Sequence, residues 1–141
     1  MSTTTRPELS EKNPYWIERH RYYELKHFCL QYYSWKKNIA SIGYHISRSG
    51  AVNMTLSGYY QPKNLPTEQL AIKRADLQRR IDLIESVCKK TDPILADYIL
   101  EAVTKGISYD ILRVNSNIPC NKAEYYELYR KFFWLLDKEH A

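Results

Sequence analysis

Histidine, glutamate and cysteine are the side chains in this sequence that could bind a metal ion or attack a substrate. Glu24 and His27 form a Glu-x-x-His pair, and His20 lies one helical turn before Glu24. Carboxylate-bridged di-iron bundles contain this motif twice and add two glutamates from partner helices, whereas this chain contains one copy. A polar helix face explains the same three residues, so we expect no metal site here.

The three cysteines are Cys29, Cys88 and Cys120. Their number is odd and no two have the C-x-x-C spacing, which argues against a disulfide framework and against a zinc finger or ribbon. We expect the three thiols to be small buried hydrophobic groups in a reducing compartment.

Motifs of the common enzyme classes are absent from the sequence. It contains no G-x-S-x-G, P-loop, G-x-G-x-x-G or H-E-x-x-H pattern, and its four glycines leave little for a phosphate-binding loop. No serine or cysteine has the surroundings of a nucleophile. The sequence therefore predicts a protein that is not an enzyme and that uses no cofactor.

Length and composition indicate a small globular protein. The chain has 141 residues, of which 44% are hydrophobic and 26% are charged, so it can form a hydrophobic core. The longest apolar run, residues 132–136, is too short to span a bilayer. The N-terminus lacks the apolar segment of a secretory signal, so we expect a cytoplasmic protein with no membrane partner.

Charge is distributed unevenly along the chain, whose net charge is +5. Residues 1–45 contain seven Lys/Arg and four Asp/Glu, and residues 46–90 contain eight and four. Residues 91–141 contain six Lys/Arg and eight Asp/Glu, so the last third is slightly acidic. This balance permits contact with nucleic acid or with an acidic protein surface, without requiring either.

Tyrosine is unusually abundant, with 13 Tyr against 3 Phe and 3 Trp. Many tyrosines are paired, as at Tyr22-Tyr23 and Tyr125-Tyr126. Tyrosine is favoured where a surface is both apolar and wet, as in a protein interface. The pairs are equally compatible with the edge of a hydrophobic core.

Helical periodicity dominates the first two thirds of the chain. We expect a mobile arm at residues 1–13 and then a helical hairpin over residues 14–90. Its first helix begins at Asn13-Pro14 and ends at Gly43, and a long connection over residues 44–66 follows, with a short extended piece possible at Val52, Met54 and Leu56. The second helix runs from Pro66 to about Lys90. Complementary apolar stripes predict that the two helices pack antiparallel.

Residues 91–141 form the third predicted segment, which is a unit of three helices. The first runs from Pro93 to Lys105 and ends at Gly106, and a short second helix is capped by Ser108. The last helix starts at Asn121, which forms an approximate capping box with Glu124. A short helix, a turn and a longer helix are the layout of a helix-turn-helix. No strand pattern competes, so the predicted fold is all-α, and the whole chain is compatible with one compact domain.

Two stretches of this last segment resemble a known family. The run Gly106-Ile-Ser-Tyr-Asp-Ile-Leu112 resembles the opening of the helix-turn-helix in sigma-factor region 4 and in phage regulators of the ArpU/RinA type. Residues 121–126, Asn-Lys-Ala-Glu-Tyr-Tyr, are similar to the start of their recognition helix, where Ser-x-x-Thr-Tyr-Tyr is usual. Asn121 and Glu124 depart from that pattern. The chain as a whole is similar to small phage and prophage proteins of Firmicutes that have no established activity.

The resemblance implies a phage-encoded regulator that binds duplex DNA inside the host bacterial cell. The last helix would meet base edges through Lys122, Ala123, Tyr126 and Arg130. Phosphate contacts supply most non-specific DNA affinity, and the acidic last helix would need them from elsewhere. The candidates are basic residues of the two long helices: Lys36, Lys37, Lys73, Arg74, Arg79 and Arg80. Each of these is also explained as an ordinary solvated charge.

A protein inhibitor of host defence, of the anti-CRISPR type, is the alternative function. The tyrosine-rich surface, the small size and the lack of catalytic motifs favour it. Its partner would be a host protein complex, and the acidic last third would be the surface that mimics nucleic acid. The sequence leaves open whether the chain forms a homo-oligomer.

Overall fold

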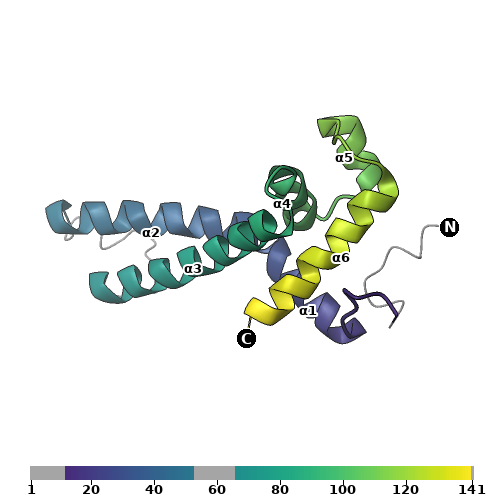
Figure 1. Ribbon diagram of the computed structural model, residues 1–141. Coiled ribbons are helices and arrows are strands. Elements are labelled where there is room, and N and C mark those ends of the chain that lie inside the picture. The colour runs from purple at the N-terminus through teal and green to yellow at the C-terminus, as the bar shows by residue number, and fades with distance from the viewer. Residues whose placement is uncertain (1–11, 53–65, 141) are drawn as a thin grey trace. The chain divides into compact units, whose positions relative to one another are not determined.

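The computed structural model describes residues 12–52 and 66–140, and this part of the chain is all-α (Figure 1). No strand occurs in the described ranges, which confirms the predicted fold class. The helices are α1 (Arg19–Leu30), α2 (Tyr32–Val52), α3 (Thr67–Thr91), α4 (Ala96–Lys105), α5 (Tyr109–Ser116) and α6 (Lys122–Glu139). None of the described helices combines the length and the apolar character that a membrane span requires.

The chain divides into two compact units. Residues 1–31 and 83–141 form one, which we call the core unit, and residues 32–82 form the other, which we call the hairpin unit. The division falls between α1 and α2 and again within α3. In the core unit α1 packs against α4 and α6, so the N-terminal helix joins the C-terminal ones.

The start of the chain differs from the single helix predicted over residues 14–42. The Asn13 side chain accepts a hydrogen bond from the Tyr15 N–H at 2.8 Å, which makes a local turn rather than a helix start. The helix begins at Arg19, and the Glu18 carboxylate caps it by accepting hydrogen bonds from the N–H groups of His20 and Arg21. It ends at Leu30, and Gln31 separates it from α2.

The predicted end of the helix at Gly43 is also wrong, because α2 continues through Gly43 to Val52. A glycine costs a helix interior only about 1 kcal/mol relative to alanine, which neighbouring contacts can offset. Gly43 lies against the Arg74 side chain, where a Cβ would be 3.5 Å from the guanidinium. Residues 44–52 of the predicted connection are therefore helical, and Val52 is not extended. Residues 53–65, including Met54 and Leu56, lie outside the described residues.

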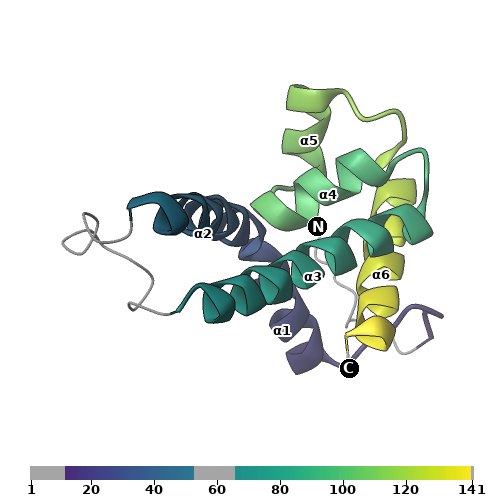
Figure 2. The same ribbon diagram turned by 90° about the vertical axis from the view of Figure 1, so that its left-hand side faces the viewer.

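The hairpin unit contains α2 and residues 67–82 of α3, which run side by side in both views (Figures 1 and 2). Arg80 lies over the Trp35 ring at 5.7 Å, and Arg74 lies against Gly43. Trp35 comes before Gly43 in α2, whereas its partner Arg80 comes after Arg74 in α3. The two helices are therefore antiparallel, as predicted. The buried side chains of this unit are Tyr32, Trp35, Ile42, Leu70, Leu77 and Ile81.

The helix ends in the C-terminal part of the core unit confirm most of the capping predictions. Gly106 ends α4 with φ +69°, and Ser108 accepts the Ile111 N–H at the start of α5. Asn121 and Glu124 form the capping box of α6, with hydrogen bonds of 2.8 and 3.1 Å. The start of α4 differs from the prediction: Pro93 lies in a turn and the helix begins at Ala96.

Large side chains from α1, α4, α5 and α6 fill the centre of the core unit. Among the most deeply buried are Leu25, Ile99, Leu112, Tyr125, Phe132, Phe133 and Leu136. Cys29 and Cys88 are buried among them, as predicted, whereas Cys120 is only half-buried. In Figure 2, α4, α5 and α6 follow one another with α5 beside the end of α4 and the start of α6, which is a helix-turn-helix-like arrangement.

Candidate nucleic-acid interface

Lys122 and Ala123 lie exposed at the N-terminal end of α6. The Lys122 ammonium lies 3.8 Å from the Asp110 carboxylate at the start of α5. Both side chains of this ion pair are well exposed, so the pair contributes little to stability and can open for another anion. Lys122 therefore remains a candidate contact to DNA.

Tyr126 does not face solvent as a base-reading side chain would. It is half-buried, and its hydroxyl accepts the Tyr109 N–H at 3.3 Å, next to the start of α5. Its ring packs edge-on against those of Tyr125 and Tyr129, at centroid distances of 4.8 and 5.7 Å. The side chain thus joins α6 to α5.

Arg130 is also turned into the unit rather than outward. Its side chain is 15% exposed, and its guanidinium donates a hydrogen bond to the Glu127 carboxylate at 2.9 Å. A guanidinium that is largely buried and paired with a carboxylate is poorly accessible to a phosphate or a base. Of the charged and aromatic side chains predicted to contact DNA from α6, Lys122 is the one that the structure leaves exposed.

A wide groove lies along the outward face at the start of α6. Its volume is about 650 Å³, and it runs between α6, the 119–120 turn and the turn before α4. Three acidic side chains line it, and no lysine or arginine does: Asp92, Glu124 and Glu127. Apolar side chains form the rest: Leu95, Pro119, Cys120, Ala123 and Leu128. Carboxylates at this place repel phosphates, so the groove itself is not a surface for nucleic acid.

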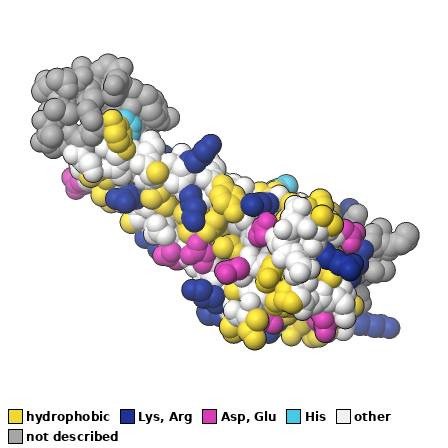
Figure 3. Space-filling model, turned by 90° about the horizontal axis from the view of Figure 1, so that it is seen from above, with side chains coloured by type: hydrophobic (Ala, Val, Ile, Leu, Met, Phe, Trp, Pro, Cys, Tyr) yellow, Lys and Arg dark blue, Asp and Glu magenta, His cyan; other side chains and the backbone are white. Residues whose placement is uncertain are grey.

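The predicted phosphate contacts on α3 belong to the hairpin unit and are exposed: Lys73, Arg74, Arg79 and Arg80. Arg79 and Arg80 both pair with Asp76, at 3.0 and 2.8 Å. Lys36 and Lys37 are exposed on α2 of the same unit. Figure 3 shows Lys and Arg side chains scattered among apolar and acidic ones on one face of the molecule.

The hairpin unit carries the whole net charge of the protein. Residues 32–82 contain eight Lys/Arg and three Asp/Glu, which makes +5. The remaining residues contain 13 of each kind and are neutral overall. The positive potential that attracts a polyanion therefore originates in the hairpin and not in the helix-turn-helix-like helices.

Comparison with models of known families, with curated proteins and with solved structures finds no match. The resemblances of the last segment therefore remain predictions.

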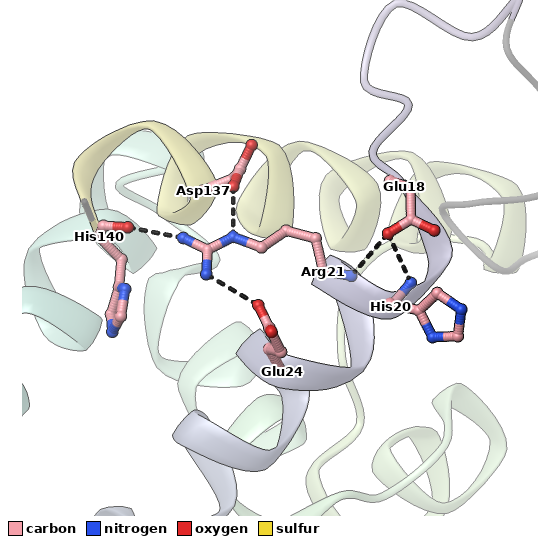
Figure 4. Close-up of polar contacts among 6 residues, drawn as sticks. All are labelled: Glu18, His20, Arg21, Glu24, Asp137 and His140. Atoms are coloured by element: carbon pink, nitrogen blue, oxygen red, sulfur yellow. Dashed lines mark hydrogen bonds and ion pairs between the residues drawn. The ribbon is translucent and has the colours of Figure 1, made fainter.

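The Glu24 carboxylate, part of the Glu-x-x-His pair, is engaged in an ion-pair network (Figure 4). Arg21 donates hydrogen bonds to Glu24 at 3.1 Å, to Asp137 at 2.6 Å and to the His140 carbonyl at 2.6 Å. The hydrogen bond to Asp137 is the main cause that raises the pKa of Arg21. This network ties α1 to the end of α6. No group of three or more His, Cys, Asp or Glu with metal-binding geometry occurs in the described ranges.

Two features were missed by reasoning from the sequence: the acidic groove and a second cavity lined by tyrosines. The groove combines residues from three places in the chain, and only those from α6 share a helix face: Ala123, Glu124, Glu127 and Leu128. The sequence contains the tyrosine pairs, but adjacent positions do not indicate that Tyr22 of α1 meets Tyr129 of α6, with hydroxyl oxygens 2.7 Å apart.

Proposed function

We propose that the protein is a DNA-binding regulator of phage origin whose hairpin unit holds the phosphate backbone. The observation that carries this proposal is the confinement of the whole net charge of +5 to residues 32–82. Lysine and arginine side chains exposed on α2 and α3 can each neutralise a phosphate and release a counterion. The neutral core unit adds little to this non-specific attraction.

Helices α4, α5 and α6 then contribute less to DNA binding than a complete recognition surface would. Lys122 is the side chain at the start of α6 that reaches DNA, either a base edge or a phosphate. Tyr126 holds α6 against α5 through its hydrogen bond with Tyr109, and Arg130 pairs with Glu127 within α6 itself. Sequence discrimination is accordingly modest, and phosphate contacts dominate affinity.

Fluorescence anisotropy with a labelled duplex at several salt concentrations tests this proposal. If three or four phosphates are contacted, the logarithm of the affinity falls with the logarithm of salt concentration with a slope of about −3. The variant Lys73→Gln should weaken binding to all duplex sequences about equally and lower the slope by about 1. Absence of binding at low salt would remove the proposal.

Lys89→Gln is the matched control for Lys73→Gln. Both lysines are exposed on α3, but Lys89 lies in the core unit. Removal of either charge changes the net charge of the protein equally. If the hairpin holds the DNA, Lys89→Gln should leave the affinity close to that of the unchanged protein. Equal losses in the two variants would contradict the assignment to the hairpin.

The acidic groove favours a second candidate, an inhibitor of host defence that binds a host protein. Its three carboxylates and apolar walls fit a basic protein surface better than a nucleic acid. Purified host nuclease complexes of the CRISPR type provide the test. Stoichiometric co-elution that is lost in a double variant, Glu124→Gln with Glu127→Gln, together with no binding to duplex DNA, would favour this function over the first.

A further inference from the structure

A second cavity in the core unit lies between α1, α4, α6 and the turn that leads into α5. It has a volume of about 210 Å³ and is partly open to solvent. An apolar cavity of about 150 Å³ is large enough to bind benzene. This cavity can therefore hold one six-membered ring with a short substituent.

Aromatic rings make up much of its wall. Tyr22, Tyr129 and Phe133 contact one another edge to face, with ring centroids 5.0 to 6.4 Å apart. The hydroxyl oxygens of Tyr22 and Tyr129 are 2.7 Å apart, which joins α1 to α6. Rings that hold one another in place present a preformed surface, and a further ring can pack against it in the same edge-to-face geometry.

The cavity has a single charged side chain, Lys26 of α1. Its ammonium lies 6.0 Å from the Tyr22 ring centroid and 5.8 Å from that of Tyr23. No carboxylate of the described residues forms an ion pair with it, and no Asp or Glu lines the cavity. A half-buried cation without a carboxylate partner is a ready site for a bound anion.

The other polar groups of the wall add to this preference. The Tyr126 hydroxyl accepts the Tyr109 N–H, so it retains its own proton for donation. Ser108 and Tyr126 both line the cavity beside the first turn of α5, which is the positive end of that helix. The chemistry of the wall thus consists of aromatic faces, one cation and hydrogen-bond donors.

We propose that this cavity binds a small monocyclic aromatic carboxylate. The ring packs against Tyr129 and Phe133, and the carboxylate faces Lys26. This site goes beyond the proposed contact with DNA and does not depend on it, because all its residues lie in the core unit and the positive charge lies in the hairpin unit.

NMR titration of the ¹⁵N-labelled full chain with benzoate tests the proposal, and benzamide is the neutral probe of the same shape. We expect saturable shifts at the amides of residues 106–108, with a dissociation constant of about 1 mM for benzoate. Benzamide should bind about fivefold or more weakly because it lacks the charge. This comparison uses the unchanged protein, so it does not depend on whether a variant folds.

Lys26→Met removes the charge and keeps most of the apolar side chain, and it should weaken benzoate binding about fivefold. Lys36→Met is the matched control, because Lys36 also lies over a tyrosine ring, that of Tyr32 at 5.0 Å, but outside the cavity. It should leave benzoate binding unchanged. The proposal is overturned by shifts that do not saturate, by equal binding of benzamide, or by benzoate binding that Lys26→Met leaves unaltered.

Discussion

Burial decides what individual side chains of this protein can do. Tyr126 and Arg130 were predicted to contact DNA, but one accepts a backbone N–H and the other pairs with Glu127. Lys122 and Lys26 instead keep charged groups that another molecule can reach. The three cysteines also differ in burial, and this difference predicts very different reactivity.

Cys120 should react with iodoacetamide in the native protein, whereas Cys29 and Cys88 should not. Burial raises the pKa of Cys88 to about 12 and that of Cys29 well above its usual value, so almost no thiolate forms at pH 8. Burial also raises the pKa of Cys120, but this thiol is only half-buried, so its labelling should be slow and should accelerate with pH. Mass spectrometry after timed labelling measures the three rates, and 6 M guanidinium, a strongly unfolding concentration, should make them similar. Native labelling of Cys88 as fast as that of Cys120 would contradict the buried position of Cys88.

At the scale of the elements, glycine has opposite roles at two helix positions. Gly106 ends α4 in the left-handed conformation, where a Cβ would also lie 3.1 Å from the Leu30 side chain. Gly43 lies inside α2 with ordinary helical geometry and has room for a Cβ at 3.5 Å from Arg74. Identical substitutions should therefore change stability in opposite directions.

Gly106→Ala should lower the free energy of unfolding by about 1 to 2 kcal/mol, because alanine is strained in the left-handed region. Gly43→Ala should raise it by up to about 1 kcal/mol, because alanine is the better helix former. Urea unfolding followed by circular dichroism measures both changes. A stabilising Gly106→Ala would show that α4 does not end in the conformation described.

At the scale of the whole molecule, the caps allowed more of the fold to be predicted than the periodicity did. Ser108, Gly106 and Asn121 have local chemistry that ends or starts a helix in any context, and the structure confirms all three. The apolar pattern encodes neither the break at Gln31 nor the contact of Gly43 with Arg74, past which α2 continues. Residues 122, 126 and 130 share a helix face, but the burial of Tyr126 depends on where α5 lies, which the sequence pattern does not give.

The charge that indicates DNA binding lies in a unit with a small core. The hairpin unit has fewer buried large side chains than the core unit in the described ranges, so its helices gain less from burial. We expect it to open independently of the core unit, at a lower free energy.

Native-state hydrogen exchange measured by NMR tests this expectation residue by residue. Amides of α2 and of residues 67–80 should exchange at least tenfold faster than those of α6, after correction for intrinsic rates, because opening the hairpin exposes less apolar surface. Leu77→Ala should raise exchange in the hairpin unit alone, because Leu77 is buried within it. Leu112→Ala, the same change in the core unit, should instead raise exchange in α4, α5 and α6. Uniform protection, with both variants affecting all helices alike, would mean that the chain unfolds as one cooperative body and that its basic hairpin is not a separate stability unit.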